Sequence, residues 1–361
     1  MTSGEREITG PVDLCLADGR LNPGAVGWSR TPLHRANLRG WGRTKRWEYW
    51  CVTTPTHLIA LTVGDLDYFR VHAVHFLAYG GYEIERTDVV PPVGGAARLP
   101  ETIAGAPLLH AAPGATPDAL QQDTDVVVGP ERPTGGRVRI EIRREEAGTR
   151  LRARCVTPER QPLEADLLVA HPEGHETMSV VVPWSPRRFQ YTSKHVALPA
   201  TGQVRVGRDV YAFGDDAWGT LDHGRGRWPR RVGWNWGAAA GRCGGRTVGL
   251  QLGGKWTIGT GATENALCVD GRVTKIDQEL DWQYSTADFL APWTVRTPGS
   301  DQVDLVFTPF HDRRARTEIG LFANRTDQCF GRYSGSVRTD HGEYVVVDNL
   351  LGWAEDVYMR W

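Results

Sequence analysis

The residues best suited to chemistry lie in the stretch 218–236, which reads W-G-T-L-D-H-G-R-G-R-W-P-R-R-V-G-W-N-W. It combines four tryptophans with the adjacent acid and imidazole of Asp222 and His223. A carboxyl group held among indole rings and away from water favours its protonated form, and indole faces stabilise a developing cation. We therefore predict that Asp222 is a general acid and that His223 orients it or takes a proton back. The alternative is an Asp222 that pairs with Arg225 or Arg227 and only fixes a turn.

The triplet Trp234, Asn235 and Trp236 is the second feature of this stretch. Side chains alternate along a strand, so both indoles would face one way and the Asn235 amide the other. If the indoles face inward they line a pocket, and if they face outward they pack between domains. We take all three, together with Trp218, as candidate ligand-binding residues.

A glycine-rich turn at 253–265 brings further candidates together: Trp256, Glu264 and Asn265. The pattern G-x-x-x-x-G-K-[ST] is missing from it, which disfavours a phosphate-binding loop. The glycines fit a tight strand crossing or a close approach to a ligand. We predict Trp256 as a pocket wall and Glu264 and Asn265 as polar anchors, with a solvated turn as the alternative.

The composition narrows the function classes. The chain has 361 residues, with 42 basic and 43 acidic side chains, and this balance argues against a general affinity for nucleic acid. Fourteen tryptophans and three methionines favour stiff rather than re-packable pocket walls. No motif indicates a cofactor, and six widely spaced cysteines favour reduced, buried thiols over a metal site. No signal peptide or membrane-spanning segment is readable, so we expect a cytoplasmic protein; its oligomeric state is not indicated.

Short β-rich runs dominate the chain, and few windows show a helical period. The alternation of apolar and charged residues at 138–143 and 151–156 predicts a hairpin, and Asp270-Gly271 predicts another. Strand patterning weakens at 92–134, and a short final helix or turn is expected at 349–357. We predict an all-β fold with two tandem barrels or sandwiches, the first at 1–186 and the second, with the tryptophan-rich pocket, at 187–361.

Five phrases of the chain resemble those of the domain-of-unknown-function family 2804. They are P-V-D-L-C from Pro11, L-N-P-G-A-V-G-W-S-R from Leu21, K-R-W-E-Y-W-C-V from Lys45, G-G-K-W-T-I-G-T-G-A-T-E-N from Gly253 and G-W-A-E-D from Gly352. The resemblance extends over the whole chain. That family is in turn similar to the calycin-type two-barrel proteins, which include carotenoid hydratases and lipocalin-like cyclases. The resemblance therefore implies two lipocalin-like barrels.

Proteins of the wider group carry a Trp followed closely by Asp-His in the strand that opens their second half. In the hydratases this Asp is thought to protonate an alkene. The corresponding residues here are Trp218, Asp222 and His223, with two more residues between Trp and Asp than is usual. On a strand, two residues preserve the face and shift the position by about 6.6 Å. The resemblance thus implies a role for these three residues.

Three functions fit the sequence. The first is a cofactor-independent lyase or isomerase, such as a hydratase or cyclase, that acts on a hydrophobic isoprenoid, lipid or polyketide-like molecule. The second is a non-catalytic carrier of such a ligand, with Asp222 as a hydrogen-bonding anchor. The third is a structural or partner-binding protein whose tryptophans fill the seam between its halves. A continuous cavity of roughly 300–1,000 Å³ at the tryptophans would separate the first two from the third.

Overall fold

The structure is almost entirely β. The computed structural model describes residues 4–91, 99–103, 125–320 and 322–361, and the helical element among them is one 3-10 turn, Pro23–Ala25. Two large antiparallel sheets and one small parallel pair, β1 (Val12–Asp13) with β3 (His34–Arg35), make up the fold. The prediction of an all-β fold in two parts is confirmed. The described part of the chain contains no helix long and apolar enough to cross a membrane.

The first sheet has 13 strands. Its main path runs in the order β7-β6-β5-β4-β15-β13-β11-β10-β9-β8, and β2, β12 and β14 attach beside it. The strands are β2 (Trp28–Ser29), β4 (Thr44–Thr53), β5 (His57–Asp65), β6 (Arg70–Ala78), β7 (Tyr82–Val90), β8 (Val126–Val128), β9 (Val138–Glu145), β10 (Gly148–Val156), β11 (Pro162–Ala170), β12 (Met178–Ser185), β13 (Arg188–Val206), β14 (Asp209–Phe213) and β15 (Trp218–Arg227).

The second sheet has nine strands in the order β19-β18-β17-β16-β24-β23-β22-β21-β20. They are β16 (Arg231–Cys243), β17 (Arg246–Gly254), β18 (Asn265–Val269), β19 (Arg272–Ile276), β20 (Asp281–Gln283), β21 (Trp293–Arg296), β22 (Val303–Ile319), β23 (Phe322–Arg338) and β24 (Tyr344–Arg360). The change from one sheet to the other falls between Arg227 and Arg231. The expected division at 186/187 therefore lies inside the first sheet, in the turn between β12 and β13.

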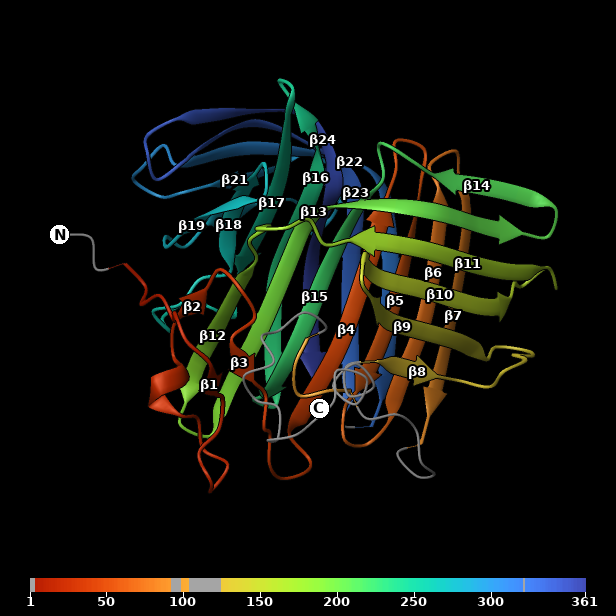
Figure 1. The fold of residues 1–361 in the computed structure, drawn as a ribbon, viewed down its shortest axis with the longest axis horizontal. Helices are drawn as coiled ribbons and strands as arrows, with labels where there is room; N and C mark the ends of the chain where they lie inside the picture. Colours follow the sequence, from red (N-terminus) through yellow and green to blue (C-terminus); the bar gives the residue numbers. More distant parts are fainter. Residues whose placement is uncertain (1–3, 92–98, 104–124, 321) are drawn as a thin grey trace.

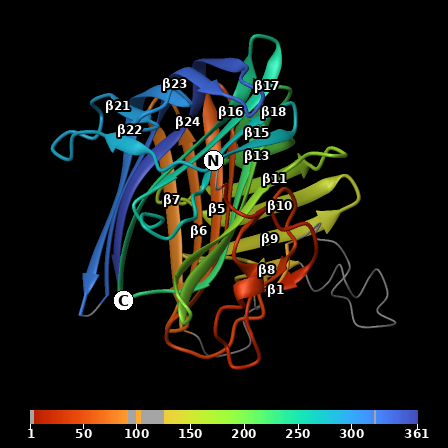
Figure 2. The same ribbon diagram turned by 90° about the vertical axis from the view of Figure 1, so that its left-hand side faces the viewer.

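Each sheet curls around its own apolar core. In the first sheet, strands β8 to β11 cross over β4 to β7 and enclose a cluster that includes Trp50, Phe76 and Leu167 (Figure 1). The second sheet encloses another cluster around Trp293 and Phe307. Figure 2 shows β4 to β7 between the strands β8 to β11 on one side and β22 to β24 on the other. Strands β4 to β7 therefore form a wall that lies between the other strands of the first sheet and the second sheet.

Local sequence explains several of these elements. The two predicted hairpins are confirmed, as β9–β10 and as β18–β19. The helix or turn expected at 349–357 is wrong, because these residues continue β24, which pairs with both β16 and β23. Pairing on both edges outweighs the local helical preference of the Ala354-Glu355 segment. Most of the weakly patterned segment 92–134 lies outside the described residues.

A buried charge cluster lies on the first-core face of the wall. Glu48 on β4 accepts hydrogen bonds from His223 Nδ1 at 2.6 Å and from Arg225 Nη2 at 2.9 Å, both on β15. Burial alone would raise the pKa of Glu48, and the neighbouring His223 and Arg225 charges outweigh it, so the pKa is lowered. Arg225 also donates to the backbone oxygens of Trp47 and Pro100. This cluster ties β4, β15 and the segment at Pro100 together.

We expect the Glu48→Gln variant to lose about 3–5 kcal/mol of unfolding free energy, because Arg225 would remain as a buried charge without its carboxylate. Urea unfolding at pH 7 measures this loss. The control is Glu318→Gln, which removes the exposed Arg360–Glu318 pair and should cost less than about 1 kcal/mol. Equal losses in the two variants would contradict the role given to Glu48.

Candidate functional site

A cavity of about 820 Å³ lies between the two sheets. Strands β4 to β7, β13 and β15 supply one side of it, and β16 and β22 to β24 supply the other. Its aromatic wall among the described residues consists of Trp47, Tyr49, Phe69, Trp228, Trp234, Trp236, Trp256, Phe322 and Trp361. A volume of this size accommodates a drug-sized apolar ligand. The continuous cavity that separates a ligand-binding protein from a structural one is therefore present.

Trp228 organises this aromatic wall. Its ring centroid lies 5.1 Å from that of Trp47, 5.7 Å from Trp234 and 5.6 Å from Trp256, all in edge-to-face geometry. Edge-to-face contacts of this kind stabilise rigid aromatic clusters beyond the burial of their area. Since the Trp228 indole is itself anchored on Gln190 Oε1 at 2.6 Å, the wall has little freedom to rearrange.

Asp222 lies in the cavity wall on β15, where it is held by three donors. It accepts from Trp47 Nε1 at 2.9 Å and from Thr192 Oγ1 at 2.9 Å, and its Oδ1 lies 3.0 Å from Lys194 Nζ. Lys194 is directly opposite Asp222 in the β13–β15 register, so the ion pair is a cross-strand pair. At Gly224, a Cβ atom would lie 2.0 Å from the Trp47 ring, so glycine there leaves the indole room to reach Asp222.

Glu264 enters the cavity from the glycine-rich turn before β18. Its Oε2 accepts from Trp256 Nε1 at 2.8 Å, and its Oε1 is buried without a hydrogen-bond partner in the described part of the chain. Gly253 makes the approach possible, because a Cβ at that position would lie 2.7 Å from Cβ of Glu264. The pKa of Glu264 is raised to about 7, chiefly by burial, with the Lys194 ammonium opposing the rise and the negative charge of Asp222 adding to it.

Glu355 on β24 is the third carboxyl group of the cavity. Its Oε1 accepts from Trp234 Nε1 at 2.7 Å, and its Oε2 accepts from Gln328 Nε2 at 3.2 Å. Gln328 Oε1 accepts from Arg313 Nη1 at 3.0 Å, which fixes the orientation of the amide. Burial raises the pKa of Glu355 to about 7. Each of the three carboxyl groups thus accepts one indole N–H, and both glutamates have a pKa near neutrality.

Five of the predicted site residues line this cavity: Asp222, Trp234, Trp236, Trp256 and Glu264. The alternation proposed for 234–236 also holds, because both indoles face the cavity while Asn235 donates to Tyr284 and to the Glu355 carbonyl. Asn265 likewise turns away and accepts from the Gly253 amide. Asn235 and Asn265 are therefore positioned to support the backbone rather than to contact a ligand.

His223 does not lie beside Asp222 in space. The two residues are adjacent on β15, so their side chains project to opposite faces, and His223 belongs to the cluster with Glu48 and Arg225. Burial lowers the pKa of His223. Its predicted partnership with Asp222 therefore has no geometric basis.

The alternative pairing of Asp222 with an arginine is also not found. Arg225 binds Glu48, and Arg227 donates to the Arg39 carbonyl. Trp218 shares a face with Asp222 but lies four residues away, where it packs on Ala197 and Ala240. It does not contribute to the cavity wall formed by the described residues.

The predicted site residues did not include three residues of the cavity wall: Lys194, Glu355 and Trp47. Lys194 on β13 and Glu355 on β24 both lie outside the stretch 218–236 in the sequence. Neither forms a motif with its chain neighbours. Trp47 lies in a β-rich aromatic run, where a role in the core fits the sequence as well as a place in a ligand wall. The signal that could have found two of the three was the set of family-like phrases, because Trp47 and Glu355 lie in those from Lys45 and Gly352.

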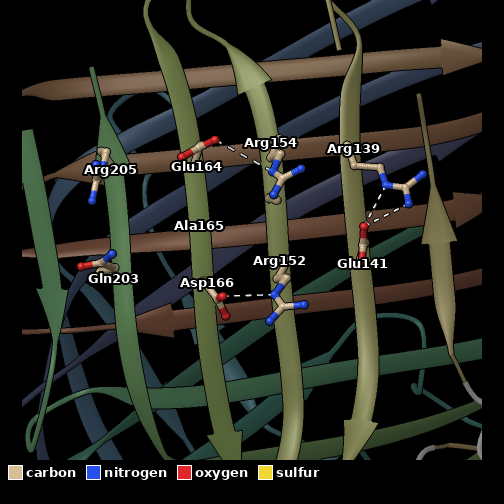
Figure 3. A pocket seen from close by; sticks show the side chains of 10 residues that line it. Arg139, Glu141, Arg152, Arg154, Glu164, Ala165, Asp166, Gln203 and Arg205 are labelled. Atoms are coloured by element: carbon tan, nitrogen blue, oxygen red, sulfur yellow. Dashed lines mark hydrogen bonds and ion pairs between the residues drawn. The ribbon is translucent and has the colours of Figure 1, made fainter. Parts of the chain in front are cut away.

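A second hollow, of about 450 Å³, lies on the outer face of strands β9 to β11 and β13. Figure 3 shows that most of its labelled side chains are charged, and that they pair both between β10 and β11 and along β9. Arg152 binds Asp166 at 3.1 Å and Arg139 binds Glu141 at 3.0 Å. Paired surface charges of this kind form an ordinary solvated sheet face, so the cavity between the sheets is the candidate site.

A family profile described as "Domain of unknown function (DUF2804)" matches residues 5–361. The chain belongs to this family. No curated protein matches the sequence. Three of the family-like phrases place side chains at the cavity, through Trp47, Trp256 with Glu264, and Glu355.

The chain is also similar to several solved structures. A candidate AttH from Nitrosomonas europaea is 14% identical, with 87% of this chain and 92% of that chain covered and a TM-score of 0.46. Kievitone hydratase from Nectria haematococca is 9% identical, with 88% of each chain covered and a TM-score of 0.43. CghA with Sch210972 is 10% identical, with 92% of this chain and 89% of that chain covered and a TM-score of 0.37.

The raised pKa of Glu264 makes stability depend on pH. Its pKa is 4.5 as a free side chain and about 7 in the fold, so between these values the native state binds more protons than the unfolded state. The unfolding free energy should therefore fall as pH rises through this window, by on the order of 3 kcal/mol from Glu264. Glu264→Gln should remove the Glu264 contribution to this pH dependence and leave the contribution of Glu355. The variant should therefore be more stable than the wild type at pH 8.

Urea unfolding between pH 4.5 and 8 measures this difference. Glu146→Gln, at an exposed position, is the control and should run parallel to the wild type. A Glu264→Gln curve that also runs parallel to the wild type would show that Glu264 is ionised throughout the window.

Proposed function

We propose that this protein is a cofactor-independent acid–base enzyme, a lyase or isomerase, that acts on a hydrophobic small molecule bound between the two sheets. Glu264 is its proton donor. The observation that carries this proposal is the buried Glu264 carboxyl in a tryptophan-lined cavity, with one oxygen bonded to an indole and the other unpartnered among the described residues.

The hydrogen bonds of Glu264 decide where its proton lies. Oε2 accepts the Trp256 N–H, so the proton of the neutral acid belongs on Oε1, the oxygen without a protein partner. At pH near 7 a carboxyl group with a pKa of about 7 is present in both its acid and its base form. Glu264 can therefore donate a proton to a ligand and accept one back.

Asp222 and Glu355 are less suited to donate. Asp222 accepts from Trp47 and Thr192 and pairs with the Lys194 ammonium, so both of its oxygens are already engaged by protein donors. Both oxygens of Glu355 accept N–H groups, so neither is open to a ligand. We therefore move the role of general acid from Asp222, where the sequence suggested it, to Glu264.

The chemistry available is proton addition followed by proton loss. Protonation of an alkene by Glu264 gives a carbocation, which the indole faces stabilise. Addition of water and return of one of its protons to Glu264 completes a hydration. Loss of a neighbouring proton to Glu264 completes an isomerisation. Every proton that leaves Glu264 is thus replaced within the same cycle.

The second candidate is a carrier, because the same cavity binds an apolar molecule without changing it. Glu264→Gln separates the two, since the amide retains the hydrogen bond from Trp256 and has no acidic proton. If the protein is an enzyme, we expect the wild type and the variant, purified from the same expressing host, to co-purify with chemically different molecules. Native mass spectrometry followed by solvent extraction identifies them.

The outcomes divide clearly. The same molecule on both proteins would favour the carrier. If Asp222→Asn changes the bound molecule and Glu264→Gln does not, then the acid is Asp222 after all. Because Asp222→Asn leaves Lys194 buried without its counter-charge, the molecule bound to this variant is compared only if circular dichroism shows a native fold.

A cavity-filling change tests whether the ligand occupies the space between the sheets. Ala73 on β6 lines the cavity, so Ala73→Phe should reduce the amount of co-purified molecule at least tenfold. Ala212→Phe places the same ring at an exposed position on β14 and should leave that amount unchanged. An undiminished yield from Ala73→Phe with native circular dichroism would place the ligand elsewhere.

A further inference from the structure

Lys194 is a buried cation whose hydrogen-bonding capacity is mostly unused by the protein. Its side chain lines the cavity, and Lys194 as a whole is 3% exposed. Its polar partner among the described residues is Asp222 Oδ1, and its Nζ lies 4.1 Å from the centroid of the Trp236 ring. An ammonium group has three N–H donors. One carboxylate oxygen and one indole face leave this group able to donate to a further oxygen.

Another buried lysine shows the contrast. Lys275 donates to Glu5 Oε1, to both oxygens of Thr263 and to the Ile276 carbonyl, so the protein itself satisfies its ammonium. Lys275 does not line the cavity, and Lys194 does. Of the two buried lysines, the one whose donors the protein leaves unused is therefore the one that lines the cavity.

Asp222 fixes the position of the Lys194 ammonium. Asp222 also accepts from Trp47 and Thr192, so its orientation is set by three elements: β4, β13 and β15. The cross-strand pairing then holds the Lys194 ammonium beside Asp222, over the Trp236 ring. A donor placed this rigidly selects a ligand by where its acceptor atom lies.

We infer that Lys194 binds a carbonyl oxygen of the ligand, and that the ligand is a neutral, largely apolar ketone, enone or ester. This inference rests on the proposed function, because it concerns the same cavity. A carbonyl is favoured over a carboxylate by the surrounding charge. Asp222 already balances the charge of Lys194, and the cavity arginines Arg313, Arg314 and Arg316 pair with Glu85, Asp312 and Asp327. Every cation that lines the cavity within the described residues therefore has a carboxylate partner, and an anionic ligand would be buried without one.

A carbonyl held by Lys194 extends the chemistry of Glu264. When water adds to the β-carbon of an enone, the carbonyl oxygen develops negative charge, which the Lys194 ammonium stabilises without giving up a proton. Glu264 protonates the α-carbon, and the proton released by the added water returns to Glu264. The net change is addition of one water across the double bond, and the reverse sequence is its elimination.

Three naphthalene probes test the inference without any turnover. They are 2-acetylnaphthalene, which carries a ketone, 2-ethylnaphthalene, which has a similar shape and no oxygen, and 2-naphthoate, which carries a carboxylate. Equilibrium dialysis against purified wild-type protein gives the dissociation constant of each. A hydrogen bond from a charged donor strengthens binding, so the ketone should bind at least about tenfold more tightly than the hydrocarbon. The carboxylate should bind more weakly than the ketone.

The variants assign this preference to Lys194. Lys194→Met should lower affinity for the ketone about tenfold and leave that for the hydrocarbon unchanged. Because Lys194→Met leaves the Asp222 carboxylate without its cation, the double variant Lys194→Met/Asp222→Asn provides the same test without a buried unpaired charge. Lys255→Met, which removes a half-exposed lysine paired with Asp356 outside the cavity, should keep the preference for the ketone.

The results separate this inference from the proposed function. Equal binding of ketone and hydrocarbon to the wild type, tightest binding of the carboxylate, or no binding of any probe would overturn it. A ketone preference that survives in both Lys194 variants would also overturn it. A Lys194-dependent ketone preference, in a protein whose co-purified molecule is the same with and without Glu264→Gln, would support carbonyl recognition and leave the protein a carrier.

Discussion

The period-two alternation of strand residues is the constraint on which the rest of this structure depends. Strands β4 and β15 are shared between two interiors, so each sends alternate side chains to the first core and to the space between the sheets. On β4, Glu48 and Trp50 face the first core while Trp47 and Tyr49 face the cavity. A shift of one residue in this register would exchange the two sets and place Glu48 among the tryptophans.

The same alternation separates the two buried charge systems of the wall. Glu48, His223 and Arg225 neutralise one another on one face, and Asp222 and Lys194 do so on the other. A backbone strand between them keeps the systems from sharing hydrogen bonds, although residues 222 and 223 are covalent neighbours. The first system serves stability, since its members bind only one another and the backbone within the described residues. The second is open to the cavity.

This division also explains how far the sequence alone could lead. The all-β class, the hairpins and the shared face of Trp234 and Trp236 followed from patterns of a few residues, where local geometry decides the outcome. Trp256 and Glu264 followed from one glycine-rich turn. The mistaken pairing of His223 with Asp222 treated two residues adjacent in the chain as if their side chains were adjacent in space. Successive side chains on a strand project to opposite faces, so this pairing cannot form.

Other parts of the site could not be predicted, for a different reason. Lys194 lies opposite Asp222 only because β13 pairs with β15, and Glu355 lies opposite Gln328 only because β24 pairs with β23. Such registers join residues tens of positions apart, and a lone lysine or glutamate in a strand carries no signal of its partner. The final strand was missed for the same reason, since its pairing with β16 and β23 is a tertiary effect.

The charge balance of the cavity accounts for an acid at neutral pH. Lys194 pairs with Asp222, and within the described residues neither of the two further carboxyl groups has a cation at ion-pair distance. Glu264 and Glu355 are each given an indole N–H, which stabilises a carboxylate less than a cation does, so burial prevails and both pKa values rise to about 7. Of the two, Glu355 also receives an amide N–H on its second oxygen, whereas Glu264 does not. Under the proposed function, Oε1 of Glu264, which has no protein donor within the described residues, is the oxygen from which a proton passes to the ligand.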